Sequence, residues 1–212
     1  MKRVLISGSS GLLGSNLARY LKKKNFEVYE ILRKRNKYKL NNKIKTIDFN
    51  SNWNTNILPK NIDIIIHLSQ SNHFRNFPKF AIDIFKVNLE STAKLLDYAT
   101  KTGVKKFIYT SSGAVYGNSK LPMREEYLNF PGHSENSYYA TTKYCAETLV
   151  KSYSSLITGI ILRPFFIYGA GQNRKTKTEA CYQTYRRLIF GKMLGDVQRL
   201  NATIIFFGQE IK

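Results

Sequence analysis

The stretch VLISGSSGLLG, residues 4–14, decides the fold. Its apolar first half has the pattern of a short buried strand, and helical spacing of leucines begins at Leu12. The glycines between them allow a tight turn and a close backbone approach to a pyrophosphate, and the helix that follows supplies free N–H groups. The stretch therefore predicts a strand, a phosphate-binding turn and a helix, although a tight turn that binds nothing would look the same.

Strands and helices alternate through the rest of the chain. Strand patterns occupy residues 3–7, 27–32, 43–49, 62–68, 104–110 and 157–162, and helical patterns occupy 12–24, 82–100 and 138–153. The segment 62–68 is apolar at nearly every position, which is typical of a strand buried on both faces, and Gly103 marks the end of the 82–100 helix. This order predicts an α/β protein with a doubly wound parallel sheet, the NAD(P)-binding Rossmann fold, over residues 1–172.

The composition is that of a globular and unusually basic chain. It has 212 residues, 42% of them hydrophobic, with a net charge of +20. Nucleic acid, an anionic ligand such as NADP or a sugar nucleotide, or a drift toward lysine would each account for the charge. Because the lysines are scattered and no aromatic-and-basic motif accompanies them, nucleic acid binding is disfavoured.

Targeting and metal-binding signals are missing from the sequence. No apolar run is long enough for a bilayer, and the short apolar N-terminus indicates a first strand and not a signal peptide. Cys145 and Cys181 stand alone, without metal-ligand spacing or a disulfide framework. We therefore expect a cytoplasmic, reduced setting, no membrane partner and no metal site.

The second strand pattern bears on the choice between NAD and NADP. It ends in Ile31-Leu32-Arg33-Lys34-Arg35, without the acidic residue that would accept a hydrogen bond from the ribose 2′-OH of NAD. Cations such as Arg33 could instead pair with the 2′-phosphate of NADP. An ordinary basic loop would have the same sequence, so the preference for NADP is slight.

A tyrosine and a lysine at helical spacing are the candidate catalytic pair. Tyr139 and Lys143 lie four residues apart, on one face of the predicted 138–153 helix. We expect the ammonium group to lower the tyrosine's pKa, which would make the phenolate a usable general base. Tyr20 and Tyr116 have the same spacing to a lysine, but only Tyr139 lies on the helix after the hydroxyl cluster at 110–112.

With SGAVYG at 112–117 and LRPFFIYGAGQ at 162–172, the chain resembles the extended short-chain dehydrogenase/reductases. Within that superfamily it is similar to the NAD(P)-dependent epimerase/dehydratases of nucleotide sugars. The resemblance implies that Ser112 binds the substrate oxygen, that Tyr139 is the acid/base and that Lys143 holds the nicotinamide ribose. It also implies a homodimer formed through the 82–100 and 138–153 helices.

The same resemblance, together with the glycine turn, implies a set of cofactor contacts. They are Gly8, Ser10, Gly11, Leu12, Leu13, Gly14, Arg33, Asp48, Phe49, Leu68, Ser69, Asn88, Tyr139, Lys143 and Pro164. His67 precedes Leu68 in the segment that covers the cofactor. Ser91 replaces the glycine that is usual three residues after Asn88.

Departures from the family pattern narrow the activity. Sugar-nucleotide 4,6-dehydratases resemble one another in having Asp-Glu at two positions that are Gly113 and Ala114 in this chain. Without these acids, water elimination is disfavoured. Phe166 replaces the asparagine that helps to hold the substrate pyrophosphate in UDP-galactose 4-epimerase-like enzymes. Arg75 could bind an anionic group or be an ordinary solvated cation. The remaining alternatives are a nucleotide-sugar epimerase, an NADPH-dependent carbonyl reductase and an NAD(P)-binding protein without catalysis.

The resemblance fades after Gln172. Residues 173–212 are basic and irregular, whereas family members usually continue into a substrate domain. We expect 173–212 to be a short remnant or an aberrant tail, with the substrate domain largely missing. The hypothesis that follows is a truncated chain, by a shift of reading frame in one version, whose activity is lost.

Overall fold

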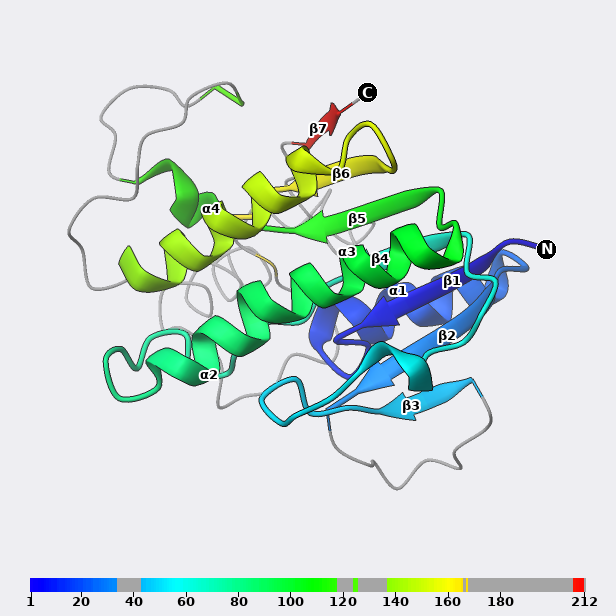
Figure 1. Ribbon diagram of the computed structural model, residues 1–212, viewed down its shortest axis with the longest axis horizontal. Helices are drawn as coiled ribbons and strands as arrows, with labels where there is room; N and C mark the ends of the chain where they lie inside the picture. Colours follow the sequence, from blue (N-terminus) through cyan, green and yellow to red (C-terminus); the bar gives the residue numbers. More distant parts are fainter. Residues whose placement is uncertain (34–42, 118–123, 126–136, 166, 168–207, 212) are drawn as a thin grey trace, which may run out of the picture.

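The computed structural model describes residues 1–33, 43–117, 124–125, 137–165, 167 and 208–211. Its sheet has the strand order β3-β2-β1-β4-β5-β6-β7 (Figure 1). The strands are β1 (Arg3–Ser7), β2 (Glu27–Leu32), β3 (Ile44–Thr46), β4 (Ile64–His67), β5 (Lys106–Thr110), β6 (Thr158–Leu162) and β7 (Gly208–Ile211). Strands β1 to β6 pair in parallel, and β7 pairs antiparallel with β6.

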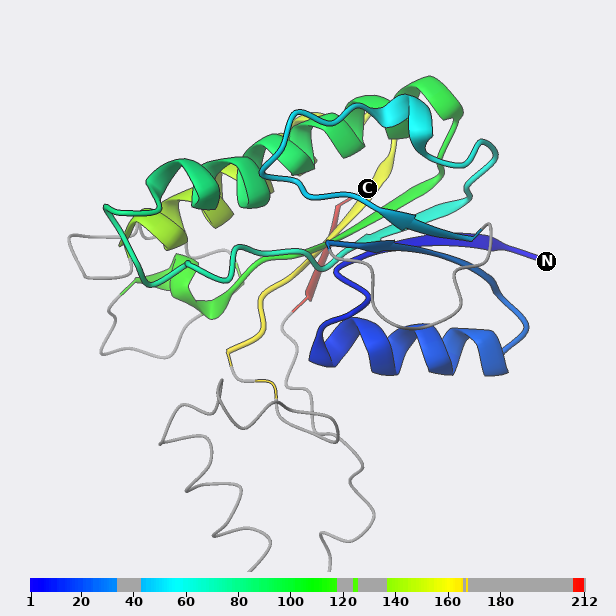
Figure 2. The same ribbon diagram turned by 90° about the horizontal axis from the view of Figure 1, so that it is seen from below.

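Helices cover both faces of this sheet, as Figure 2 shows. Helix α1 (Leu12–Lys23) lies on one face, and the other carries α2 (Ala81–Phe85), α3 (Ser91–Thr102) and α4 (Ser137–Ser152). Shorter turns are η1 (Thr55–Ile57), the π turn η2 (Lys86–Glu90) and η3 (Gly113–Tyr116). None of the described helices has the length and apolar character needed to cross a membrane.

The predicted doubly wound α/β fold is confirmed, with differences at element boundaries. The helix predicted at 82–100 is α2, η2 and α3 in succession, so a π turn interrupts it. Gly103, with a φ of 73°, ends α3 in the left-handed conformation that glycine favours. Strand β7 was not foreseen in the sequence. Because residues 168–207 lie outside the described residues, the domain boundary at 172 stays a prediction.

Successive side chains along each strand point to opposite faces of the sheet, so a hydrophobic core forms on each face. In β1, Leu5 packs into the larger cluster with Ile65 and Phe107, beneath α3 and α4. Val4 and Ile6 point to the opposite face, in the cluster that α1 covers. Burial on both faces fixes the register of the parallel strands, and so it fixes where their carboxyl ends meet.

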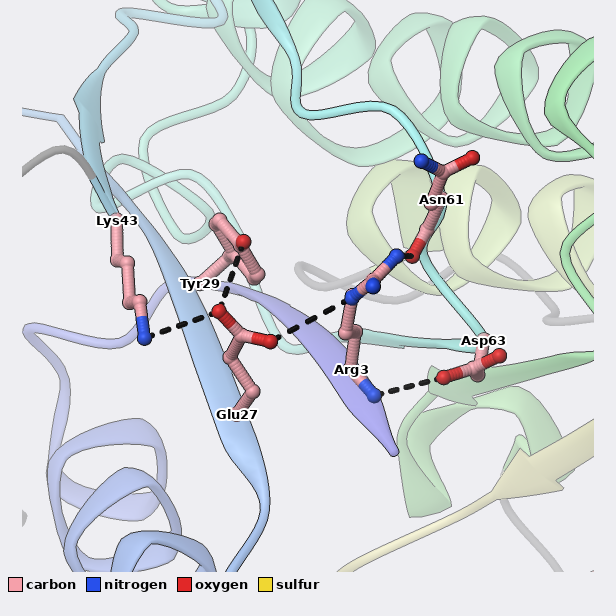
Figure 3. Close-up of polar contacts among 6 residues, drawn as sticks. All are labelled: Arg3, Glu27, Tyr29, Lys43, Asn61 and Asp63. Carbon is pink, nitrogen blue, oxygen red and sulfur yellow. Dashed lines mark hydrogen bonds and ion pairs between the residues drawn. The ribbon is translucent and has the colours of Figure 1, made fainter. Parts of the chain in front are cut away.

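Polar contacts stabilise the end of the sheet at which strands β1 and β2 begin (Figure 3). The main-chain N–H of Arg3 donates to Asp63 Oδ2 at 2.7 Å, and the Arg3 Nε lies 3.4 Å from Glu27 Oε2. Lys43 Nζ lies 3.0 Å from Glu27 Oε1, and hydrogen bonds from Lys43 and Tyr29 lower the pKa of the Glu27 carboxyl. These contacts lie at the amino ends of the strands. Open α/β sheets bind their ligands at the other end, beyond the carboxyl ends of the strands.

Candidate active site

A cavity of about 910 Å³ opens at the carboxyl ends of the parallel strands. Among the predicted catalytic and cofactor-binding residues, those that line it are Gly8, Ser10, Gly11, Leu12, Leu13, Gly14, Arg33, Asp48, Phe49, Leu68, Ser69, Ser112, Tyr139 and Pro164. Lys143 and Asn88 are not among the lining residues; both are buried behind the wall. The structure therefore brings the glycine turn and two of the three candidate catalytic residues to one cavity.

The glycine turn is built so that a backbone surface faces this cavity. Gly8 has a φ of 73°, and a Cβ placed there would lie 2.9 Å from the main-chain nitrogen of Ser69. A Cβ on Gly14 would lie 2.3 Å from the carbonyl oxygen of Gly8, so only glycine lets α1 begin so close to the turn. Gly11 caps α1 without a side-chain hydrogen bond, which leaves the first N–H groups of the helix available to an anion.

Buried hydroxyl groups provide a test of whether the cavity suits a polar ligand. Thr110 Oγ1 and Ser111 Oγ are buried and have no hydrogen-bond partner among the described residues, and both residues line the cavity. Buried polar atoms are rarely left unpaired, so these hydroxyls fit a ligand that hydrogen-bonds there. With the anion-accepting turn, they fit a dinucleotide and the polar substrate beside it.

Tyr139 is the candidate acid/base at the inner end of the cavity. Its hydroxyl donates to Gln70 Oε1 at 3.1 Å, and its ring lies 5.1 Å from that of Phe74. Burial raises the pKa of Tyr139, while a hydrogen bond with Ser112 and the positive charge of Arg75 lower it. The expectation that Lys143 lowers this pKa is wrong for the structure, because burial has the largest effect and Lys143 is not among the causes.

Lys143 lies behind the cavity wall. It is 1% exposed, and its Nζ donates to the main-chain oxygen of Thr110 at 2.8 Å. Burial lowers its pKa to about 7, although the nearby Glu147 carboxylate raises it. Lys143 thus anchors α4 to the end of β5, next to the unpaired hydroxyls.

A buried ion pair continues the same face of α4 and was not foreseen in the sequence. Arg163 donates to both carboxylate oxygens of Glu147, from Nε at 2.9 Å and from Nη2 at 2.6 Å. Its guanidinium also lies 4.8 Å from the ring centre of Tyr116. The pair ties α4 to the segment that leads into Pro164. The only sequence signal was an acid four residues beyond Lys143.

Asn88 connects the loop after β4 to the catalytic helix. Its Oδ1 accepts from the Ser71 N–H at 2.9 Å, and its Nδ2 donates to Thr142 Oγ1 at 3.1 Å. Thr142 Oγ1 in turn donates to the main-chain oxygen of Tyr139 at 2.7 Å. Because the oxygen and the nitrogen of its side-chain amide are both used in these bonds, Asn88 supports the cavity wall. Its direct contact with a cofactor stays a prediction.

The loop after β4 lines the cavity, and Arg75, which the sequence singled out as a cation that could bind an anionic group, is one of its lining residues. Cavity-lining residues that it supplies beyond Leu68 and Ser69 are Gln70, Asn72, His73, Phe74 and Arg75. The Arg75 guanidinium lies 4.9 Å from the ring centre of Phe74. Lys34, Arg35, Phe166, Gln172 and Cys181 lie outside the described residues. In the described part of the chain, no group of three His, Cys, Asp or Glu side chains could hold a metal ion.

Residues 4–201 match the sequence profile of the NAD dependent epimerase/dehydratase family. The chain belongs to this family. It is 33% identical over 196 residues to a dTDP-D-glucose 4,6-dehydratase of Dictyostelium discoideum, covering 81% of this chain and 45% of that protein. It is 26% identical over 178 residues to a UDP-glucose 4-epimerase of Vibrio cholerae, covering 80% of this chain and 53% of the epimerase. The resemblance drawn from the motifs is confirmed, and the chain spans about half the length of these relatives.

Solved structures of family members share the fold. MoeE5 in complex with UDP-glucose and NAD superposes with a TM-score of 0.71 at 26% identity, covering 90% of this chain and 62% of MoeE5. A UDP-glucuronic acid 4-epimerase from Bacillus cereus, in complex with UDP-glucuronic acid and NAD, gives 0.69 at 25% identity, covering 88% of this chain and 62% of the epimerase. Each of these complexes contains NAD and a nucleotide sugar.

Proposed function

We propose that this protein binds NAD(P) against the glycine turn and epimerises a nucleotide sugar by transient oxidation of a sugar hydroxyl. The observation that carries the proposal is the convergence of the glycine turn, Ser112 and Tyr139 on one cavity. Relatives that are crystallised with NAD and UDP-sugars support the same ligand classes. A carbonyl reductase would use the same residues but would consume the cofactor.

In the proposed mechanism the chain's own side chains move the proton. Tyr139 as phenolate takes the proton of the sugar hydroxyl and later returns it to the same oxygen. Ser112 hydrogen-bonds that oxygen, and its contact with Tyr139, like the charge of Arg75, opposes the rise in the tyrosine's pKa that burial causes. A bound nicotinamide supplies the acceptor and donor of hydride. Lys143 supports the site from behind through its bond to Thr110.

The preference for NADP over NAD is the finer part of the cofactor proposal. Arg33 directly follows β2 and lines the cavity, as a residue that pairs with a 2′-phosphate would. No carboxylate takes the place at the end of β2 that would accept from the 2′-OH of NAD. A cytoplasmic setting, expected from the isolated cysteines, also stays a prediction.

Position 113 argues against a dehydratase. A Cβ on Gly113 would lie 2.5 Å from Cδ1 of Phe165, and the Gly113 N–H donates to the main-chain oxygen of Pro164 at 2.9 Å. A carboxylic side chain therefore has no room there unless Phe165 moves. The overall similarity to a 4,6-dehydratase does not supply the acid that water elimination needs.

A homodimer through α2 and α4 is part of the same proposal. Exposed apolar side chains at Phe77, Ile82 and Phe85 support it. The ring of Tyr138, at the start of α4, stacks on Phe77 with ring centres 4.6 Å apart. These side chains form one apolar surface of the kind that pairs two copies of a chain.

Cofactor binding followed by turnover tests the function. The purified chain is titrated with NAD(H) and NADP(H) by thermal shift and by fluorescence of Trp53, the single tryptophan, whose ring centre lies 4.8 Å from that of the cavity-lining Phe49. We expect micromolar binding, a raised melting temperature and tighter binding of NADP(H). UDP-sugars are then screened for epimerisation without net change in the cofactor.

Tyr139→Phe is the matched variant for the catalytic assignment. Removing the hydroxyl removes the general base, so we expect a loss of turnover of about 10²- to 10⁴-fold with nearly unchanged cofactor affinity. Equal turnover in this variant would contradict the role of Tyr139. Cofactor binding without turnover of any UDP-sugar would favour the non-catalytic alternative, and net oxidation of NADPH would favour the reductase.

A further inference from the structure

Arg33 and Asn72 face each other across the cavity. Arg33 directly follows β2, Asn72 belongs to the loop after β4, and the strand order places β1 between those two strands. With the Asn72 amide oxygen turned toward the guanidinium, as hydrogen bonding requires, Oδ1 accepts from Arg33 Nη2 at 2.6 Å and from Nη1 at 3.3 Å. Both residues line the cavity together with the glycine turn that follows β1. The hydrogen bond therefore joins the two walls on either side of that turn.

This contact can open without disturbing the fold. Both residues are exposed, and within the described chain neither side chain makes another hydrogen bond or ion pair. Opening the pair breaks only a charge-assisted contact with one acceptor atom, and the freed groups return to water. A ligand as long as a dinucleotide could thus enter the cavity before the two side chains meet again.

The charge of Arg33 indicates what the pair closes over. A guanidinium has five N–H donors, and the contact with a single amide oxygen leaves others for a second acceptor. The groove between the two walls contains the free N–H groups at the start of α1, where an anionic diphosphate binds. Through its contact with Asn72 the guanidinium reaches from the end of β2 to the loop after β4, so donors that Asn72 does not use remain for the diphosphate as well as for the 2′-phosphate of the proposed function.

We propose that Arg33 and Asn72 form a clasp that closes over the diphosphate of the bound dinucleotide and slows its release. In this clasp Asn72 is a positioning residue for Arg33. The proposal rests on the NAD(P) site of the proposed function and adds a determinant of how long the cofactor stays. Slow release suits an epimerase, because the cofactor is regenerated in each turnover.

Release kinetics of the full chain test the clasp. NADH is bound first and is then displaced by excess NAD⁺ in a stopped-flow instrument, with energy transfer from Trp53 to NADH as the signal. The variants are Asn72→Ala, Arg33→Ala and the double variant. Asn76→Ala is the control, since Asn76 lies in the same loop but does not line the cavity. The same series is repeated with NADPH, displaced by NADP⁺.

We expect Asn72→Ala and Arg33→Ala each to speed release of both cofactors by about three- to tenfold, the effect of one charge-assisted hydrogen bond at an exposed site. The double variant should release no faster than Arg33→Ala alone, because both substitutions remove one contact. Asn76→Ala should match the unaltered chain.

Release from Asn72→Ala at the unaltered rate would overturn the clasp, and so would additive effects of the two substitutions. Faster release of NADPH alone in Arg33→Ala would assign Arg33 to the 2′-phosphate and would overturn the clasp as well. A complete lack of dinucleotide binding by the unaltered chain would be a different outcome, since it would overturn the proposed function on which the clasp rests.

Discussion

His67 is a fully buried histidine whose protonation state follows from its neighbours. Thr92 Oγ1 donates to the main-chain oxygen of Asn88 at 2.8 Å, and Ser91 Oγ donates to that of Val87 at 2.7 Å. With both hydroxyl protons used, these oxygens can only accept from His67 Nε2, which lies 3.1 and 3.2 Å away. The ring is therefore neutral with its proton on Nε2, and Nδ1 accepts from Ser7 Oγ at 2.5 Å.

Because the His67 ring is neutral in the folded chain, the free energy of unfolding depends on pH. Burial, with a smaller effect of the Lys143 charge, lowers its pKa to about 3. Between pH 6.5 and 3 the unfolded chain binds a proton that the folded chain does not, so this contribution to stability is lost as the pH falls through that range. We expect His67→Asn, which has an amide donor and acceptor but no titrating group, to be less stable at pH 7 and less sensitive to acid.

Urea unfolding at pH 7, 6 and 5 measures this difference. The free energy of unfolding of the unaltered chain should fall relative to His67→Asn by up to about 1.4 kcal/mol per pH unit, the slope for one proton. The carboxylates titrate in both proteins and cancel in the comparison. Parallel curves for the two proteins would contradict the assignment.

At the scale of elements, the π turn η2 joins segments that the sheet keeps apart. It contains Asn88, whose amide bonds the loop after β4 through Ser71 and helix α4 through Thr142. Ser71 also bonds Asp83 of α2 through its hydroxyl, so the same loop is held twice. π turns interrupt α-helices mostly at functional sites, and this one supports the wall that carries Gln70 and Asn72.

Asn88→Ala should loosen that wall. It leaves the buried Ser71 N–H without its acceptor, at a cost of about 1–3 kcal/mol. Thr142 Oγ1 loses a donor but keeps its own hydrogen bond to the main-chain oxygen of Tyr139. We expect a clear fall in the free energy of unfolding and a weaker affinity for NAD(P)H, measured by denaturation and by Trp53 fluorescence. Unchanged cofactor affinity in a folded Asn88→Ala would argue against coupling between η2 and the cavity.

These elements also show where sequence reasoning reached its limit. The strand-glycine-helix pattern at 4–14 is local, so it predicted the strand, the turn and the helix. Asn88 was identified from a motif, but its partners Ser71 and Thr142 are distant in sequence and depend on the π turn, which has no clear signature. The pair of Arg163 with Glu147 and that of Arg33 with Asn72 likewise need three-dimensional packing. Burial, which raises the pKa of Tyr139 more than neighbouring charges lower it, is also invisible in a spacing rule.

At the scale of the whole molecule, the apolar surface and the net charge act against each other. Phe77, Ile82 and Phe85 are 50%, 66% and 42% exposed, and the hydroxyl of Tyr138 bonds the main-chain oxygen of Ala81 at 3.1 Å. The start of α4 and α2 thus lie together, and in the proposed dimer this apolar face would lose water to a second copy. Each copy carries a net charge of +20, so two copies also repel each other.

Dimerisation should therefore strengthen as salt is added. Between about 0.05 and 0.5 M the screening length falls from over 10 Å to under 5 Å, which weakens the repulsion while the apolar attraction remains. Sedimentation equilibrium should show a dimer whose dissociation constant decreases over this range, and Ile82→Glu should remain a monomer throughout. Leu156→Glu, in the turn between α4 and β6 and 68% exposed in the parent chain, should dimerise like the unaltered protein. If Leu156→Glu abolished the dimer and Ile82→Glu did not, the interface would lie elsewhere. Dissociation of the dimer on adding salt would show that ion pairs, and not this apolar face, hold the two copies together.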